Sequence, residues 1–151
     1  MPTTNPVPTT NPVPTSNPVD TVDVLVIGAG ISGIGAGHYL TTELPSKTFT
    51  IIEARDAAGG TWDLFRYPGI RSDSDLHTFG YEFKPWRDKQ SIADAPRILS
   101  YLHEAIDEDG LAEHIRYGHR VVSAAWSSDE SQWTVNIDRS EDNARIQIKA
   151  S

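Results

Sequence analysis

The chain has 151 residues, which is room for about one domain. Its formal net charge of -8 at pH 7, with no cluster of Lys and Arg, excludes a surface that follows nucleic-acid phosphates. The absence of cysteine excludes disulfides and thiolate metal sites, and the five histidines show no ligand-like pairing with carboxylates, so we expect no metal site.

Residues 1–19 repeat a hexapeptide, as PTTNPV, PTTNPV and PTSNPV. This proline-rich tract has no aromatic residue and cannot bury enough apolar area to offset the entropy of ordering it. We therefore predict a disordered leader over residues 1–19 and a folded part over residues 20–151, with a proline-rich ligand for a partner as the alternative. The N-terminus lacks the basic region of a secretory signal, and the most apolar run, residues 22–34, is too short for a transmembrane segment, so we expect a cytoplasmic protein.

The folded part begins with the pattern of a strand, a helix and a second strand. The sequence TVDVLVIGAG, residues 21–30, is a β-branched apolar run ending in glycine, typical of a strand buried on both faces of a parallel sheet. The helix is expected over residues 31–44, before Pro45, and a second buried strand over residues 48–53. This order predicts an α/β fold that begins with a Rossmann-like βαβ unit.

A glycine motif, G-x-G-x-x-G, joins the first strand to the first helix at Gly28, Gly30 and Gly33. In dinucleotide-binding folds the first glycine permits a tight turn, the second lets the backbone approach a pyrophosphate, and the third lets the helix pack closely on the strand. The start of the helix offers free N–H groups and a partial positive charge to the phosphates, with Ile31 and Ser32 as the expected donors.

Glu53, at the end of the second strand, strengthens this prediction because a carboxylate there can accept hydrogen bonds from both ribose hydroxyls of an adenosine. The same carboxylate would repel a 2'-phosphate, so the unit is expected to hold FAD or NAD and not NADP. The alternative is that the three glycines serve only a tight turn and that Glu53 is a surface acid.

The segment after Glu53 does not re-enter a helix at once but runs through the adjacent glycines Gly59 and Gly60. Such glycines allow the backbone to approach a second part of the ligand. This favours FAD, because its flavin half must be reached by the loop that follows the second strand.

The rest of the chain predicts one helix and three strands. Residues 95–108 have an amphipathic pattern with Asp94 as the N-cap. Three β segments, residues 119–126, 132–138 and 145–150, are separated by polar turns. We therefore expect an antiparallel β-meander appended to the βαβ unit.

Three stretches of the sequence, GAGISG, IIEARDAAGGTWDLFRYPGIRSDSD and HTFGYEFKPW, resemble the N-terminal part of class B flavin monooxygenases. More narrowly, they are similar to the Baeyer-Villiger monooxygenases of the EthA type, and the resemblance spans about residues 20–151. It implies an enzyme that oxidises ketones to esters through a peroxyflavin, with FAD, NADPH and oxygen, acting on a small-molecule carbonyl substrate.

The same resemblance implies contacts with FAD in two parts of the chain. In the βαβ unit these lie around the glycine motif, at Ser32 and at Glu53. After the double glycine and beyond, they include Thr61, Trp62, Asp63, Leu64, Asp73 and the backbone of Val121.

A third implied group, Arg71, Ser72 and Asp73, matches the segment where the nicotinamide of NADP meets the flavin in the family. Asp73 is the implied catalytic residue, which would face the flavin and position an arginine expected beyond Ser151. Six residues beyond Asp73, where relatives often have a tyrosine, this chain has Phe79 and therefore lacks a hydroxyl at that position. The residues alone leave open that Asp73 and Asp75 cap a helix start and that Arg71 is a surface charge.

Several family features do not occur in these 151 residues. They are a second G-x-G-x-x-G for NADPH, the fingerprint F-x-G-x-x-x-H-x-x-x-W, and a strand ending in Ala-Thr-Gly after the meander. We therefore expect an incomplete domain, the FAD-binding segment of a longer enzyme, which does not turn over by itself. Two alternatives stay open: a flavin monooxygenase that attacks nitrogen or sulfur, and a non-catalytic nucleotide-binding module whose proline repeat recruits a partner.

Overall fold

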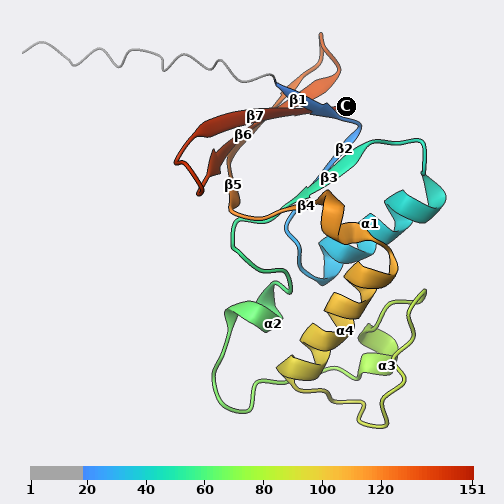
Figure 1. The fold of residues 1–151 in the computed structure, drawn as a ribbon. Helices are drawn as coiled ribbons and strands as arrows, with labels where there is room; N and C mark the ends of the chain where they lie inside the picture. The colour runs from blue at the N-terminus through green and yellow to red at the C-terminus, as the bar shows by residue number, and fades with distance from the viewer. Residues whose placement is uncertain (1–18) are drawn as a thin grey trace, which may run out of the picture.

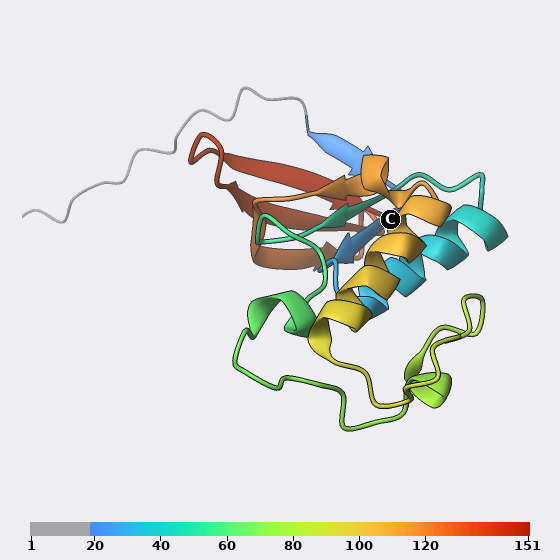
Figure 2. The same ribbon diagram turned by 60° about the horizontal axis from the view of Figure 1, so that its bottom comes forward.

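The computed structural model describes residues 19–151, so the predicted leader lies outside the described residues except for Val19. Two sheets and the two longest helices form three layers (Figure 1). A parallel sheet lies in the middle, helices cover one of its faces, and a largely antiparallel sheet packs on the other (Figure 2).

The first predicted strand consists of two short strands in different sheets. β1 (Asp20–Val22) pairs in parallel with the last strand, β7 (Arg145–Ala150). β2 (Val24–Ile27) pairs in parallel with β3 (Phe49–Ile52). The prediction of one continuous strand over residues 21–30 is therefore wrong, because apolar patterning does not reveal where a chain moves from one sheet to another.

Asp23 lies at this crossing between the sheets. Its carboxylate accepts hydrogen bonds from the backbone N–H and the hydroxyl of Thr48, both at 2.8 Å, and from Lys47 Nζ at 3.1 Å. The hydrogen bonds from Thr48, followed by that from Lys47, lower the pKa of Asp23 to about 2. The chain is thus fastened where it leaves one sheet for the other.

The predicted βαβ unit is confirmed, with α1 (Ile31–Glu43) connecting β2 to β3. Every residue of β3 is buried, whereas β2 is only partly buried and the side chain of Ile27 is 59% exposed. In the sheet order β2-β3-β4, β3 is central and β2 lies at an edge of the described sheet. The expectation of a strand buried on both faces therefore holds for β3 and fails for β2.

The connection from β3 to the next long helix contains two one-turn helices, α2 (Thr61–Leu64) and α3 (Leu76–Phe79). The sequence did not predict α2, whereas a helix start near Asp75 was one of the two open interpretations of that segment. The long helix, α4 (Ala95–Glu108), has the predicted bounds. Its N-cap is Asp94, as predicted, and the carboxylate accepts a hydrogen bond from the N–H of Arg97 at 3.2 Å.

After α4, a 3-10 turn (η1, Leu111–His114) leads into β4 (Ile115–Arg116), a two-residue strand that pairs in parallel with β3. The sequence did not predict β4, because two residues carry no periodicity. β5 (His119–Ser127) and β6 (Gln132–Arg139) then join β7 in the predicted antiparallel meander.

Apolar side chains that point to opposite faces of the parallel sheet join the three layers. Ile51 and Ile52, adjacent in β3, belong to different clusters, since successive residues of a strand point to opposite faces. The cluster toward the helices includes Ile34, Ile51, Ile98, Leu102 and Leu111. The cluster toward the meander includes Ile52, Val135, Ile137 and Ile148.

Candidate functional site

The glycine loop, residues 28–33, has the backbone geometry that its motif predicts. Gly28 has a φ of 100°, which side chains rarely tolerate. A Cβ on Gly33 would lie 1.9 Å from the carbonyl oxygen of Gly28, so only glycine allows the helix to pack this close to the strand. Gly30 is the N-cap residue of α1 and provides no side-chain cap, which leaves the start of this 13-residue helix to backbone N–H groups.

Glu53 lies directly beside the glycine loop and is not a surface acid. Its side chain accepts a hydrogen bond from the N–H of Ala29 at 2.9 Å and one from the N–H of Arg55 at 3.0 Å. The residue is only 8% exposed. Each carboxylate oxygen thus has one backbone donor and retains the capacity to accept a further hydrogen bond.

The start of the meander is fastened to the same strand end. The N–H of His119 donates to the carbonyl of Glu53 at 2.8 Å, and the N–H of Gly118 donates to the carbonyl of Arg55 at 2.9 Å. Val121, two residues further along β5, is half-buried and pairs with Ile137. The strand that contains Val121 therefore begins next to Glu53.

Tyr117, which sequence reasoning did not select, lies near the same carboxylate. Burial, and secondly the charge of Glu53, raise the pKa of the Tyr117 hydroxyl. Only the following Gly118, a turn residue between two apolar segments, could have marked the position in the sequence.

The double-glycine turn, residues 59–64, packs against the glycine loop. The N–H of Gly59 donates to the carbonyl of Ala29 at 2.8 Å. A Cβ on Gly60 would lie 3.1 Å from the Cα of Gly30, so the two glycines face each other across a close backbone contact. The structure thus brings together the glycine loop, Glu53 and the double-glycine turn, which we call the glycine edge.

The four residues of α2 differ in what they contact. Thr61 and Leu64 are exposed, whereas Trp62 packs against the apolar core under the helices. The carboxylate of Asp63 is engaged by two arginines, Arg55 and Arg66. Thr61 and Leu64 are therefore the side chains of α2 that are open to a ligand.

The segment of Arg71, Ser72 and Asp73 is arranged differently. Arg71 and Asp73 are exposed, and Arg71 Nε donates to the carbonyl of Gly69, at 3.3 Å. Ser72 is buried, and its hydroxyl donates to the carbonyl of Ser74 at 2.7 Å. Among the described residues, no hydrogen bond joins this segment to the glycine edge.

The interpretation of Asp73 and Asp75 as helix caps is correct for Asp75 alone. Asp75 is the N-cap of α3, and its carboxylate accepts a hydrogen bond from the N–H of Thr78 at 3.0 Å. Hydrogen bonding by the side chain of Thr78, and secondly by its N–H, lowers the pKa of Asp75. Asp73 lies outside this cap, and its carboxylate accepts a 3.5 Å hydrogen bond from the hydroxyl of Ser74. Asp73 is thus not explained by helix capping.

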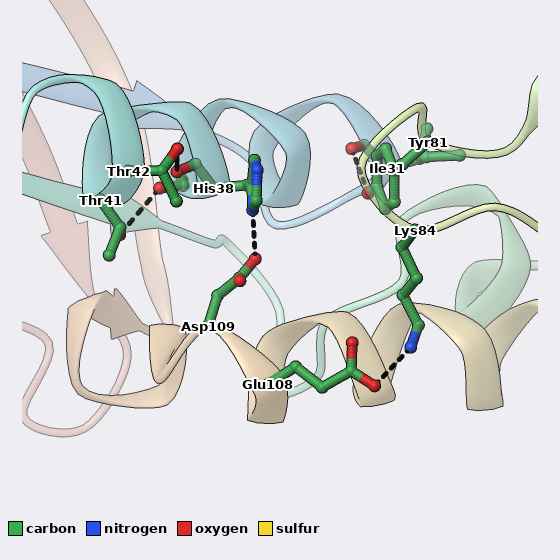
Figure 3. A network of polar contacts seen from close by, with 9 residues as sticks. Ile31, His38, Thr41, Thr42, Tyr81, Lys84, Glu108 and Asp109 are labelled. Carbon is green, nitrogen blue, oxygen red and sulfur yellow. Dashed lines mark hydrogen bonds and ion pairs between the residues drawn. The ribbon is translucent and has the colours of Figure 1, made fainter.

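The first turn of α1 is held from the side by the segment before α4 (Figure 3). The Tyr81 hydroxyl donates to the carbonyl of Ile31 at 2.5 Å, and the ring lies over Gly35, where a Cβ would be 3.0 Å away. Burial raises the pKa of this hydroxyl well above its ordinary value, which keeps it protonated as the donor. Further along α1, His38 Nδ1 lies 2.9 Å from Asp109 Oδ2.

Residues 19–151 contain neither a cluster of metal ligands nor a membrane-spanning helix. No group of three or more metal-ligating side chains occurs among them. No helix in that range is long and apolar enough to cross a membrane.

Comparison with known proteins gives both sequence and structural matches. A family model described as an NAD(P)-binding Rossmann-like domain matches residues 26–88. The FAD-containing monooxygenase EthA of Mycolicibacterium smegmatis is 50% identical over 129 residues, which are 85% of this chain and 26% of that protein. Oxidized steroid monooxygenase bound to NADP is 32% identical, with a TM-score of 0.73, over 85% of this chain and 25% of that one. Cyclohexanone monooxygenase with bound ε-caprolactone is 34% identical, with a TM-score of 0.75, over 87% of this chain and 26% of that one.

These matches confirm the predicted fold class and the resemblance to flavin monooxygenases. They also show that the chain spans about a quarter of the length of the relatives it matches.

Proposed function

Because this chain belongs by sequence and fold to the FAD-containing monooxygenases, we propose that residues 20–151 are the FAD-binding part of an NADPH- and oxygen-dependent monooxygenase. The observation that carries the proposal is the glycine edge. Two glycine segments in close backbone contact and a buried carboxylate meet at the carboxyl ends of β2 and β3, where open α/β sheets bind their ligands.

The adenosine half of FAD would be held by the βαβ unit. The N–H groups of Ile31 and Ser32, at the uncapped start of α1, would bind the pyrophosphate. Glu53 would accept the ribose hydroxyls, since its oxygens are already oriented by Ala29 and Arg55. The backbone of Val121 would approach the adenine from the strand that begins beside Glu53.

The double-glycine turn would hold the other half of FAD. Gly60 permits close approach of its backbone, and the exposed Thr61 and Leu64 would contact the flavin side of the ligand. Trp62 and Asp63 would support this turn from below, through the core and through Arg55.

The bound flavin would supply the reduction of oxygen and the transfer of one oxygen atom. Arg71, Ser72 and Asp73 are proposed for the side of the flavin that meets the nicotinamide of NADPH. Ser72 is fastened to its neighbours, while Arg71 and Asp73 keep exposed charges that could position a second cofactor and a further cation.

We propose Baeyer-Villiger oxidation as the reaction of the whole protein. The balance is ketone, oxygen, NADPH and a proton to ester, water and NADP⁺, so one oxygen atom enters the carbon chain and the other becomes water. The relative with bound ε-caprolactone supports a carbonyl substrate, because this lactone is cyclohexanone with one oxygen inserted beside its carbonyl.

The test is a titration of the full 151-residue chain with FAD, in which quenching of flavin fluorescence reports binding. We expect saturable binding, and we expect no ketone oxidation on addition of NADPH and cyclohexanone, since the sequence has a single G-x-G-x-x-G motif. A chain that is folded by circular dichroism but does not bind FAD would contradict the binding proposal. Ester formation by this chain alone would contradict the second expectation.

A further inference from the structure

Arg55 connects the two halves of the glycine edge. Its N–H donates to Glu53 Oε1 at 3.0 Å, and its side chain reaches the double-glycine turn, where Nη1 donates to the Gly60 carbonyl at 3.1 Å. The guanidinium also forms an ion pair with Asp63 Oδ2. One residue is therefore bonded both to the acid proposed for the ribose and to the turn proposed for the flavin half.

The carboxylate of Asp63 depends on this contact. Its side chain is 13% exposed, and Oδ2 is buried without a hydrogen-bond partner among the described residues other than the ion-paired Arg55. The other oxygen, Oδ1, accepts a hydrogen bond from Arg66 Nη2 at 2.9 Å, but the side chain of Arg66 is 77% exposed. A buried charge needs its counter-charge far more than an exposed one, so Arg55 and Arg66 form a matched pair of test and control.

The turn that Arg55 holds has little stability of its own. α2 is a single turn, too short to persist as an isolated helix. Gly59 and Gly60, just before it, have φ values of 116° and 54°, and glycine samples many backbone conformations when nothing restrains it. A guanidinium is well suited to restrain this turn, because its planar fork can bond a carbonyl and a carboxylate at once.

We propose that Arg55 is a positioning residue of the FAD site, which fixes the double-glycine turn relative to Glu53. The inference rests on the proposed function, because it concerns the same FAD site. Arg55 acts through Gly60 and Asp63, so its loss should weaken contacts with the flavin half and leave those with the adenosine half in place.

The experiment compares two ligands on the full chain. FAD reports the whole site, whereas ADP contains only the part that would contact the glycine loop and Glu53. We expect Arg55→Gln to lower the affinity for FAD by about tenfold or more and the affinity for ADP by less than about twofold. Arg55→Lys should recover only part of the loss, since an ammonium lacks the planar fork, and Arg66→Gln should leave FAD affinity within about twofold of the wild type.

Two results would overturn the inference alone: an Arg55→Gln variant that binds FAD as tightly as the wild type, and equal losses for FAD and ADP. A wild-type chain that binds neither ligand would overturn the proposed function itself, and the inference with it.

A second variant keeps the inference testable if Arg55→Gln does not fold. Asp63→Asn removes the partner charge, so it should also lower the affinity for FAD and leave the affinity for ADP unchanged. The double variant should then lose no more affinity than the more affected single variant, because both changes break one contact. Additive losses would mean that Arg55 acts on the ligand directly and would overturn the positioning role.

Discussion

Two regions of this molecule carry residues that the family resemblance assigns to cofactors, and they are built in opposite ways. In the glycine edge, Glu53 is buried and bonded to two backbone N–H groups, and the two glycine segments touch. In the loop that follows, residues 65–75, Phe65, Tyr67, Arg71 and Asp73 are exposed. A site made from the ends of packed strands is formed by the fold itself, whereas the loop presents side chains that have few contacts to fix them.

The largest effect is expected from a substitution that changes the backbone packing of the glycine edge. Gly33→Ala would place a Cβ 1.9 Å from the carbonyl oxygen of Gly28, so β2 and α1 would have to separate. We expect the free energy of unfolding to fall by about 2–3 kcal/mol. Urea denaturation monitored by circular dichroism measures this free energy.

Gly30→Ala is the matched control. Its φ of -86° suits alanine, and the nearest atom to the new Cβ would be Gly60 Cα at 3.6 Å. Stability should change by less than about 1 kcal/mol, while FAD binding should weaken because the methyl group occupies the space for the pyrophosphate. Equal destabilisation by the two variants would show that close packing at Gly33 is not what the fold requires.

The second largest effect is expected at the buried acid. Glu53→Gln keeps the size of the side chain but removes the charge, and it should weaken FAD by about tenfold. Fluorescence titration measures the change, and Glu43→Gln, at the exposed end of α1, should leave the affinity unchanged. An unchanged affinity in Glu53→Gln would place the ribose elsewhere.

Asp23, whose carboxylate binds the backbone at the crossing between the sheets, should also contribute to stability, with a smaller effect. The pKa of Asp23 is lowered from 3.8 to about 2 by its bonds to Thr48 and Lys47. Its contribution to stability is therefore fully present above pH 3.8 and is lost as the pH falls toward about 2. The difference in Tm between the wild type and Asp23→Asn should shrink over this range, and a difference that grows with acid would contradict the assignment.

The smallest effect is expected in the exposed loop. Asp73→Asn and Arg71→Gln should each change FAD affinity of this chain by less than about threefold, and stability by less than about 0.5 kcal/mol, since both side chains are exposed. The same titration and denaturation measure both quantities. If either variant weakened FAD as much as Glu53→Gln, the two regions would form a single site in this chain.

Local geometry explains how much of the fold and the site could be predicted. The glycine motif demands specific backbone conformations, and a strand end fixes Glu53 beside it, so sequence spacing alone locates both. The amphipathic pattern and the capping residue likewise predict α4.

Features that depend on distant partners could not be predicted. The division between β1 and β2 depends on pairing with β7, more than a hundred residues away in the sequence. The hydrogen bond from Tyr81 to Ile31 likewise joins residues that no local pattern connects. The contact of Arg55 with Asp63 spans only eight residues but requires the positive φ values of the intervening glycines.

The central claim is that this chain holds FAD through its adenosine half, with Glu53 as the ribose acceptor. The most direct test titrates the wild-type chain with FAD and with FMN, which has the same flavin ring but no adenosine. We predict that FAD binds at least about tenfold more tightly than FMN, and that Glu53→Gln removes most of this difference. Equal affinities for FAD and FMN in the wild-type chain would contradict the claim.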